Sequence, residues 1–361
     1  MDFVKRRETN RIKLGRVQIG GGAPISIQSM TNTDTYDKEA TYRQVLALEE
    51  AGCDIVRITV PHADAAPIFG ELKKRGVGIP LVADIHFSHE AAIASVLAGA
   101  DKIRINPGNI GSGDKVAAVA EVCAAHGVPI RIGVNSGSVE KSILEKHGAP
   151  TAEALVESAL YHASLLEELD FHDIAVSVKA SDVPTMIAAN RLLAEKTSYP
   201  IHLGVTEAGA RDSALVKSSI GIGTLLSEGI GDTVRVSLTD DPIKEVSAAR
   251  EILKALKLTA DGGIEIVGCP TCGRTKINLI KLLSEFEDRI KAEGLDRLSL
   301  KVALMGCVVN GPGEAREADI GIAGGVGEGL LFKKGVPVRK IKEDRLIDEL
   351  IDEIKKMRSE Q

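Results

Sequence analysis

The chain has 361 residues, of which 44% are hydrophobic and 27% charged, a composition typical of a globular protein of about two domains. Its formal net charge of −6 argues against general nucleic-acid binding. The opening stretch MDFVKRRETNRIKLG has no apolar run, and no segment approaches the roughly eighteen apolar residues of a membrane span. With only five cysteines, a disulfide framework is excluded, so we expect a cytoplasmic protein without membrane or nucleic-acid partners.

Eight short β-rich segments alternate with helical patterns along the first two thirds of the chain. This rhythm predicts a (β/α)8 TIM barrel. A doubly wound sheet is the alternative, but it usually has fewer strands and a glycine fingerprint after the first one, whereas GGGAPIS precedes the first strand here. The helical patterns often end in Ala-Gly, which is typical of a glycine C-cap. The expected strands are 24–30, 54–60, 80–86, 101–106, 129–135, 173–179, 200–206 and 232–238.

Within these strands, polar and apolar residues alternate with a period of two, which predicts one polar and one apolar face. We expect the apolar face to lie against the helices and the polar face to point inward, near the carboxyl ends where barrels of this type carry their chemistry. The apolar set is Ile58, Ile85, Ile105, Ile132, Val178, Leu203 and Val236. The polar set is Arg57, Thr59, Asp84, His86, Arg104, Asn106, Arg131, Asn135, Ser177, Lys179, His202, Thr206, Arg235 and Ser237.

Five of the inward residues are cations, which is hard to explain as ordinary core polarity. Burying an unpaired positive charge costs several kcal/mol per ion, and Asp84 and Glu207 cannot balance all five. Arginine side chains suit phosphate oxygens. The sequence therefore predicts a pocket for a small substrate that carries more than one phosphate charge. The cations are Arg57, Arg104, Arg131, Lys179 and Arg235.

A polar joint, KLTADGG, near residue 260 predicts a barrel domain over 1–258 and a second domain over 262–361. The second domain holds Cys269 and Cys272 in VGCPTCGR and Cys307 in MGCVVNGPGEA. All eight histidines lie at or before residue 202, so a fourth ligand in this domain would be an oxygen, such as Glu314. This donor set favours an iron–sulfur cluster over zinc, with a redox dithiol third because it leaves Cys307 unexplained.

The two remaining cysteines, Cys53 and Cys123, lie in the barrel part of the sequence. Cys53 follows EEAG just before an expected strand, and Cys123 lies in the helical pattern AAVAEVCAAHG. We expect both to be buried and to behave as small apolar side chains.

Seven strings occur in order along the chain: ADIHF, KIRINPGN, RIGVNSGS, SVKASD, HLGVTEAG, VGCPTCGR and MGCVVNGPGEA. Together they resemble the bacterial 4-hydroxy-3-methylbut-2-enyl diphosphate synthases, from about residue 10 to about residue 345. The sequence lacks the large middle insertion of the plant-type enzymes. The resemblance implies a barrel like that of pterin-binding synthases and a smaller α+β domain like a sulfite/nitrite reductase half-domain.

The resemblance also implies a 4Fe-4S cluster held by three cysteines and one glutamate, which here are Cys269, Cys272, Cys307 and Glu314. It implies a homodimer in which the cluster domain of one chain caps the barrel of the other. The substrate would be 2-C-methyl-D-erythritol 2,4-cyclodiphosphate of the non-mevalonate isoprenoid pathway. Two electrons from flavodoxin or ferredoxin would open its ring and remove an oxygen as water.

These expectations give each candidate residue a role. The cations at the strand ends should clamp the diphosphate, with neutral hydrogen bonds from two further side chains. Three groups at strand ends are candidates for proton transfer: Glu207, Asp84 and His86. The predicted substrate-binding residues are Arg57, Arg104, Arg131, Asn135, Ser177 and Lys179.

Two other functions remain open from the residues alone. Lys179 ends the sixth expected strand, a suitable place for the imine lysine of a Schiff-base aldolase, in which case the cysteines would form a zinc knuckle. The chain could also be a non-catalytic sensor of a phosphorylated metabolite that contacts a partner through its metal domain. Iron content, borohydride trapping and substrate consumption distinguish these functions.

Overall fold

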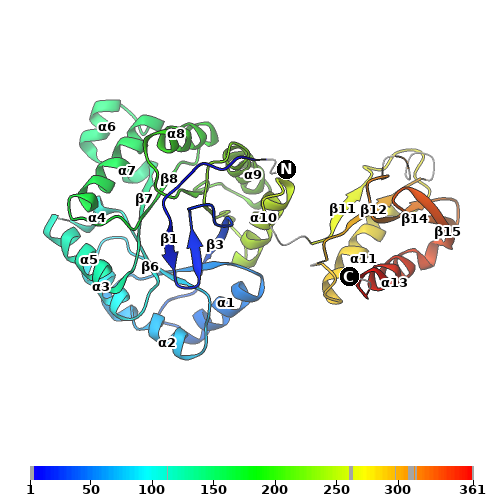
Figure 1. Ribbon diagram of the computed structural model, residues 1–361, viewed down its shortest axis with the longest axis horizontal. Coiled ribbons are helices and arrows are strands. Elements are labelled where there is room, and N and C mark those ends of the chain that lie inside the picture. Colours follow the sequence, from blue (N-terminus) through cyan, green and yellow to red (C-terminus); the bar gives the residue numbers. More distant parts are fainter. Residues whose placement is uncertain are drawn as a thin grey trace. The chain divides into compact units, whose positions relative to one another are not determined.

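The computed structural model describes residues 4–111, 113–259, 263–296, 298–307, 313 and 315–359 (Figure 1). The chain forms two compact units, Met1–Thr259 and Ala260–Gln361. Each has its own hydrophobic core, and each is described by itself below.

The first unit is a parallel β-barrel in which the strands follow one another in chain order. Hydrogen bonding runs from β3 through β8 in sequence, and β10 lies between β9 and β3. A bridge between Val176 and Ile201 joins β8 to the start of β9 and closes the ring. All eight predicted strands are therefore present, although β9 and β10 are short. The strands are β3 Ser26–Met30, β4 Ile55–Thr59, β5 Leu81–Asp84, β6 Lys102–Ile105, β7 Ile130–Asn135, β8 Ile174–Lys179, β9 His202–Leu203 and β10 Thr233–Val234.

Helices surround the barrel, and their ends follow local sequence signals. Asp37, Ser88 and Asp182 each accept a hydrogen bond from a backbone N–H in the first turn of the helix that follows. Gly52 and Gly99, which close two of the predicted Ala-Gly endings, have φ values of +80° and +98°, which only glycine adopts without strain. The helices are α1 Lys38–Glu50, α2 Ile68–Lys74, α3 His89–Leu97, α4 Pro107–Ile110, α5 Gly113–His126, α6 Lys141–His147, α7 Ala152–Glu167, α8 Val183–Lys196, α9 Arg211–Ser227 and α10 Pro242–Ala255.

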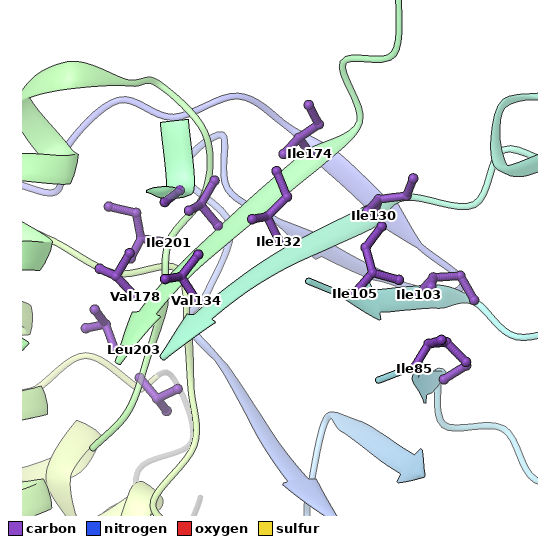
Figure 2. Close-up of a cluster of buried hydrophobic side chains, with 14 of the residues drawn as sticks. Ile85, Ile103, Ile105, Ile130, Ile132, Val134, Ile174, Val178, Ile201 and Leu203 are labelled. Atoms are coloured by element: carbon purple, nitrogen blue, oxygen red, sulfur yellow. The ribbon is translucent and has the colours of Figure 1, made fainter. Parts of the chain in front are cut away.

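The main core lies between the strands and these helices. Figure 2 shows branched aliphatic side chains along the strands from Ile85 to Leu203, all of them buried. Every residue that the period of two assigned to the apolar face belongs to this core. The alternate residues within the strands, such as Arg57, Arg104 and Arg131, therefore face the barrel interior, as the sequence predicts.

An antiparallel hairpin closes the amino-terminal end of the barrel. It consists of β1 Ile12–Leu14 and β2 Val17–Ile19, which pair from Ile12 with Ile19 to Leu14 with Val17. Its side chains form an apolar cluster with residues near the start of two barrel strands, so this end is filled. The cluster, which we call the barrel floor, is Leu14, Ile19, Ile55 and Val82.

In its described residues, the second unit is a five-stranded mixed sheet packed against helices α11 and α13. The strand order is β11-β12-β13-β14-β15, parallel over the first three strands and antiparallel over the rest. The apolar sides of both helices pack with Val302, Leu304 and Ile322 in one core. The elements are β11 Glu265–Gly268, α11 Leu279–Ala292, β12 Lys301–Met305, β13 Ile320–Gly324, β14 Glu328–Lys333, β15 Val336–Lys342 and α13 Leu346–Ser359.

Candidate functional site

Asp84 ends β5 and lies between two arginines of the barrel interior. Its carboxylate is 3.6 Å from Nε of Arg57 and 3.3 Å from Nη1 of Arg104. Burial alone would raise the pKa of Asp84, but these two guanidinium groups outweigh burial and hold that pKa below its ordinary value. Asp84 is therefore held as a carboxylate, which favours orienting the arginines over donating a proton.

Arg57 on β4 has a second neighbour that the sequence did not predict. Its Nη2 and Nε lie 2.9 Å and 3.3 Å from the thioether sulfur of Met30, the residue opposite Arg57 on β3. Burial lowers the pKa of Arg57 to about 10, while Asp84 opposes that change. The side chain thus stays charged at neutral pH, between the carboxylate of Asp84 and the sulfur of Met30.

Arg131 on β7 is the most enclosed arginine of the interior, with 1% of its surface exposed. Its Nη1 donates a 2.6 Å hydrogen bond to the hydroxyl of Ser177 on β8. Among the described residues, its Nε and Nη2 have no hydrogen-bond partner. Burial, followed by the charges of Arg57 and Arg104, lowers the pKa of Arg131. Such a guanidinium gains most from a ligand that brings negative charge.

Lys179 ends β8 and is buried near the same arginines. Gly204 makes room for it, because a Cβ atom at Gly204 would lie 2.7 Å from the Lys179 nitrogen. In the described part of the chain no carboxylate lies within ion-pair distance of Lys179. Burial, and then the charges of Arg131 and Arg57, lower the pKa of Lys179 well below its ordinary value.

Lys102 is a further interior cation that the sequence reading passed over. It precedes Arg104 by two residues on β6, so the same period of two places it on the inner face. It is 1% exposed, and within the described residues its amine has no hydrogen-bond partner. The signal was therefore present in the string KIRIN, where two cations share one face.

Arg235 needs a correction, because it is not an unbalanced cation. Glu245 of α10 accepts hydrogen bonds from Arg235 Nε at 3.2 Å and Nη2 at 3.0 Å, and it is buried. It also accepts from the Ser29 hydroxyl and the Leu238 N–H. The sequence analysis did not predict Glu245. Its spacing of four residues from Ala249 places it on the buried face of α10, which indicates a buried carboxylate with a partner.

The interior nevertheless keeps an excess of positive charge. Four arginines and two lysines share it with Asp84 and Glu245, while the third buried carboxylate of the described barrel, Asp232, pairs with Arg6 outside this group. His202 does not add to the charge, since burial, followed by Lys179 and Arg131, lowers its pKa well below the ordinary value. A buried excess of this size is stabilised by an anionic ligand.

Three other predicted site residues lie further out. His86 and Glu207 are exposed, and Glu207 has a φ of +49°. No hydrogen bond joins His86 to Asp84 among the described residues, although His86 also helps to lower the pKa of Asp84. Asn135 is half-buried at the end of β7, opposite Lys179 in the ladder. The exposed His86 and Glu207 are accessible for proton transfer, while Asn135 lies beside the cationic interior.

Cys269 and Cys272 follow β11 in the second unit, and Cys307 follows β12, the neighbouring strand. Cys269 and Cys307 are half-buried, while Cys272 is exposed. The Gly306 N–H donates to the Cys269 sulfur at 3.2 Å. Hydrogen bonds from Arg274, from its backbone first, lower the pKa of Cys272.

These thiols have the donor chemistry of a metal–sulfur site, since N–H groups near sulfur stabilise thiolates. Within the described residues, however, no three His, Cys, Asp or Glu side chains are already grouped to hold a metal ion. Glu314 lies outside the described residues. The sequence and the donor types, rather than a preformed cage, thus point to a metal here.

Cys53 and Cys123 are buried, as predicted. Burial raises the pKa of each thiol to about 12, so neither is a reactive group at neutral pH. Within the described residues, no helix combines the length and the apolar character that crossing a membrane requires.

Comparison with known proteins gives the family. Residues 9–250 match the family model described as the GcpE TIM-barrel domain, and residues 265–356 match the GcpE protein C-terminal domain. A protein of Ruminiclostridium cellulolyticum named 4-hydroxy-3-methylbut-2-en-1-yl diphosphate synthase (flavodoxin) is 58% identical over 99% of both chains. A protein of Clostridium perfringens with the same name is 56% identical over 96% of this chain and 98% of its own.

Among solved structures, a dihydropteroate synthase of Yersinia pestis has a TM-score of 0.49 and 13% identity, covering 69% of this chain and 99% of that one. A likeness this weak carries no argument about this chain. The two family matches, by contrast, span both units in order, and the relatives match over nearly their full length. The chain therefore belongs to the GcpE family.

Proposed function

We propose that this chain catalyses the two-electron reductive ring opening of 2-C-methyl-D-erythritol 2,4-cyclodiphosphate to (E)-4-hydroxy-3-methylbut-2-enyl diphosphate. The observation that supports it most is the excess of buried cations in the barrel interior, which calls for a ligand with more than one negative charge. A cyclic diphosphate is such a ligand. The names of the GcpE relatives agree with the same activity and give flavodoxin as the electron donor.

In this proposal the interior side chains bind and orient the diphosphate. Arg57, Arg104, Arg131 and Lys179 contact phosphate oxygens, while Asp84 fixes the two arginines beside it. Asn135 adds a neutral hydrogen bond, and Ser177 holds Arg131 in place. Several cations on one diphosphate lower the energy of the negative charge that is released when the ring phosphate leaves carbon.

The proposed reduction needs two electrons, which the barrel side chains do not supply. We assign a 4Fe-4S cluster to Cys269, Cys272, Cys307 and Glu314, because thiolates are the usual holders of such clusters. When bound, the cluster would supply single electrons and a Lewis-acidic iron. The N–H donors beside Cys269 and Cys272 fit thiolate ligands. We also propose a homodimer, which light scattering tests by measuring the molar mass in solution.

Removal of the substrate hydroxyl as water needs a proton. Glu207 is exposed at the carboxyl end of the barrel and has no ion-pair partner among the described residues, so we propose it as the donor. His86 is the second candidate, being exposed on the loop after β5. Asp84 is the least suited of the three, because two arginines keep it ionised.

The test is anaerobic turnover of the cyclodiphosphate with reduced flavodoxin. Wild-type protein should consume the substrate and form the open diphosphate. Glu207→Gln should bind substrate with similar affinity and react about 100-fold or more slowly, since a positioned general acid contributes that much. Glu207→Asp, which keeps a carboxyl group, is the matched control and should recover part of the rate.

Three outcomes would contradict these assignments. Binding without consumption by the iron-loaded protein would favour a sensor over an enzyme. Trapping of a carbonyl compound on Lys179 by borohydride would favour an aldolase. Unchanged turnover of Glu207→Gln would remove Glu207 from proton transfer and leave His86 as the candidate.

A further inference from the structure

Lys102 lies below the residues assigned to the diphosphate. On β6 it is two residues closer to the amino end of the barrel than Arg104. Its partner in the ladder is Val82, which belongs to the barrel floor. Lys102 therefore lies level with the edge of the apolar floor, one inward-facing position below Arg104, with 1% of its surface exposed.

The charged groups that act on Lys102 disfavour a positive charge on its amine. Arg131 comes from β7 and Arg57 from β4, and His202 on β9 is close enough for Lys102 to oppose its protonation. Within the described residues, no carboxylate is paired with Lys102 and its amine has no hydrogen-bond acceptor. Burial, followed by Arg131 and Arg57, lowers the pKa of Lys102 well below its ordinary value.

We propose that Lys102 is a positioning residue that takes up a proton when the diphosphate binds, so that substrate binding is coupled to proton uptake. This inference rests on the proposed function. The negative charges of the ligand lie against Arg131 and cancel its repulsion of Lys102, so an ammonium group there becomes stable. Lys102 then adds a positive charge behind the guanidinium that contacts the ligand.

The coupling has a definite sign. A group that is neutral in the free protein and charged in the complex makes binding tightest at low pH. Affinity then falls by up to about tenfold per pH unit between the pKa of Lys102 in the free protein and its pKa in the complex. Without substrate, a neutral Lys102 lowers the free-energy cost of burying several positive charges in the barrel interior.

Calorimetry tests this directly with the iron-loaded protein, the cyclodiphosphate, no electron donor and no oxygen. Titrations at pH 8 in two buffers with different ionisation enthalpies give the number of protons taken up. The ligand cannot contribute, because each phosphorus of a cyclic diphosphate carries only one strongly acidic group. Wild-type protein should take up protons, and Lys102→Met should take up about one fewer.

Lys102→Arg is the matched control, since arginine stays charged in both states. It should also lose about one proton of uptake, yet keep its affinity at pH 8, where Lys102→Met should bind about tenfold or more weakly. Circular dichroism checks that both variants fold.

Binding by wild-type protein without proton uptake would overturn the inference, as would full uptake by both variants, which would assign the proton to His202 or Lys179. If wild-type protein reduces the substrate but takes up no proton, only the role of Lys102 fails. If it does not bind the cyclodiphosphate at all, the proposed function fails as well.

Discussion

Ser177 acts on the site through Arg131. Its hydroxyl accepts a 2.6 Å hydrogen bond from Nη1 of that arginine, and both residues are buried. In the same guanidinium, Nε and Nη2 have no partner among the described residues. One fixed bond and two free donors give Arg131 a set orientation toward a ligand.

Ser177→Ala should therefore weaken substrate binding more than it slows the reaction. A hydrogen bond to a charged group contributes about 1.5–3 kcal/mol, so we expect KM to rise about tenfold or more with kcat nearly unchanged. Steady-state kinetics measure both. Ser218→Ala on α9 removes a buried hydroxyl that has no partner among the described residues, and it should leave KM unchanged. An equal effect of both changes would show that Ser177 acts through general packing.

Cysteine reactivity should follow burial rather than position in the chain. With a pKa of about 12, Cys53 and Cys123 are thiolates at pH 8 in only about one molecule in 10⁴. In metal-free protein, iodoacetamide should label Cys272 first, because it is exposed and its pKa is lowered. Loading iron and sulfide should protect the three thiols of the second unit, as peptide mass spectrometry would detect.

Labelling of all five thiols in denaturant is the control for that experiment. Rapid labelling of Cys53 in native protein would contradict its burial, and labelling of Cys272 after loading would contradict its role as a ligand.

Among the elements, α8 depends on a residue far away in the sequence. Arg7 donates hydrogen bonds from Nη1 and Nη2 to the carbonyl oxygens of Ala194, Thr197 and Tyr199, which end α8 and lead into β9. These carbonyls would otherwise lack partners, as at any helix end. Burial lowers the pKa of Arg7, with Asp232 opposing that change. The amino-terminal segment thus fastens the end of a barrel helix.

Arg7→Ala should lower the free energy of unfolding of the barrel by about 2–4 kcal/mol, because several charge-assisted hydrogen bonds are lost together. Urea unfolding followed by circular dichroism measures the change. Arg11→Ala, at an exposed position in the same segment, should have an effect below about 0.5 kcal/mol. Similar stabilities of the two variants would mean that the segment adds little to the barrel.

Each of the two units has its own main hydrophobic core, which sets an expectation for unfolding. Phe286 on α11 and Phe69 on α2 are both fully buried, one in each core. Phe286→Ala should lower only the transition of the second unit, by about 3–5 kcal/mol, and Phe69→Ala only that of the barrel. Removing iron should destabilise the second unit alone, because the proposed cluster ligands all belong to it.

Differential scanning calorimetry with and without a chelator measures both transitions. A single transition that shifts as a whole in either variant would show that the two units unfold cooperatively.

The sequence predicted the barrel well because strand alternation is local. Short β-rich segments identified the eight barrel strands, and the period of two placed Ile85, Ile132 and Leu203 in the core. The hairpin β1–β2 and the strands of the second unit were not predicted. Glu245 escaped prediction because its partner, Arg235, is joined to it by tertiary packing, not by a pattern within one strand. Lys102 was predictable from its spacing to Arg104 but was passed over.

For the proposed metal centre, the sequence indicates the ligand types but not how they converge. Cys269 and Cys307 follow neighbouring strands, so strand pairing is what brings them together, and it is not visible in either motif alone. Glu314 stays a prediction.

The hairpin at the amino-terminal end of the barrel affects how substrate enters and product leaves. Leu14, Ile19, Ile55 and Val82 fill the amino-terminal end of the described barrel, so we expect small molecules to enter at the carboxyl end. The diphosphate that is made must leave by the way the cyclic one came in, so the two compete for one passage. An unreactive diphosphate bound at the carboxyl end of the barrel would block substrate entry and product release together. This end is therefore where we expect a small inhibitor to stop turnover.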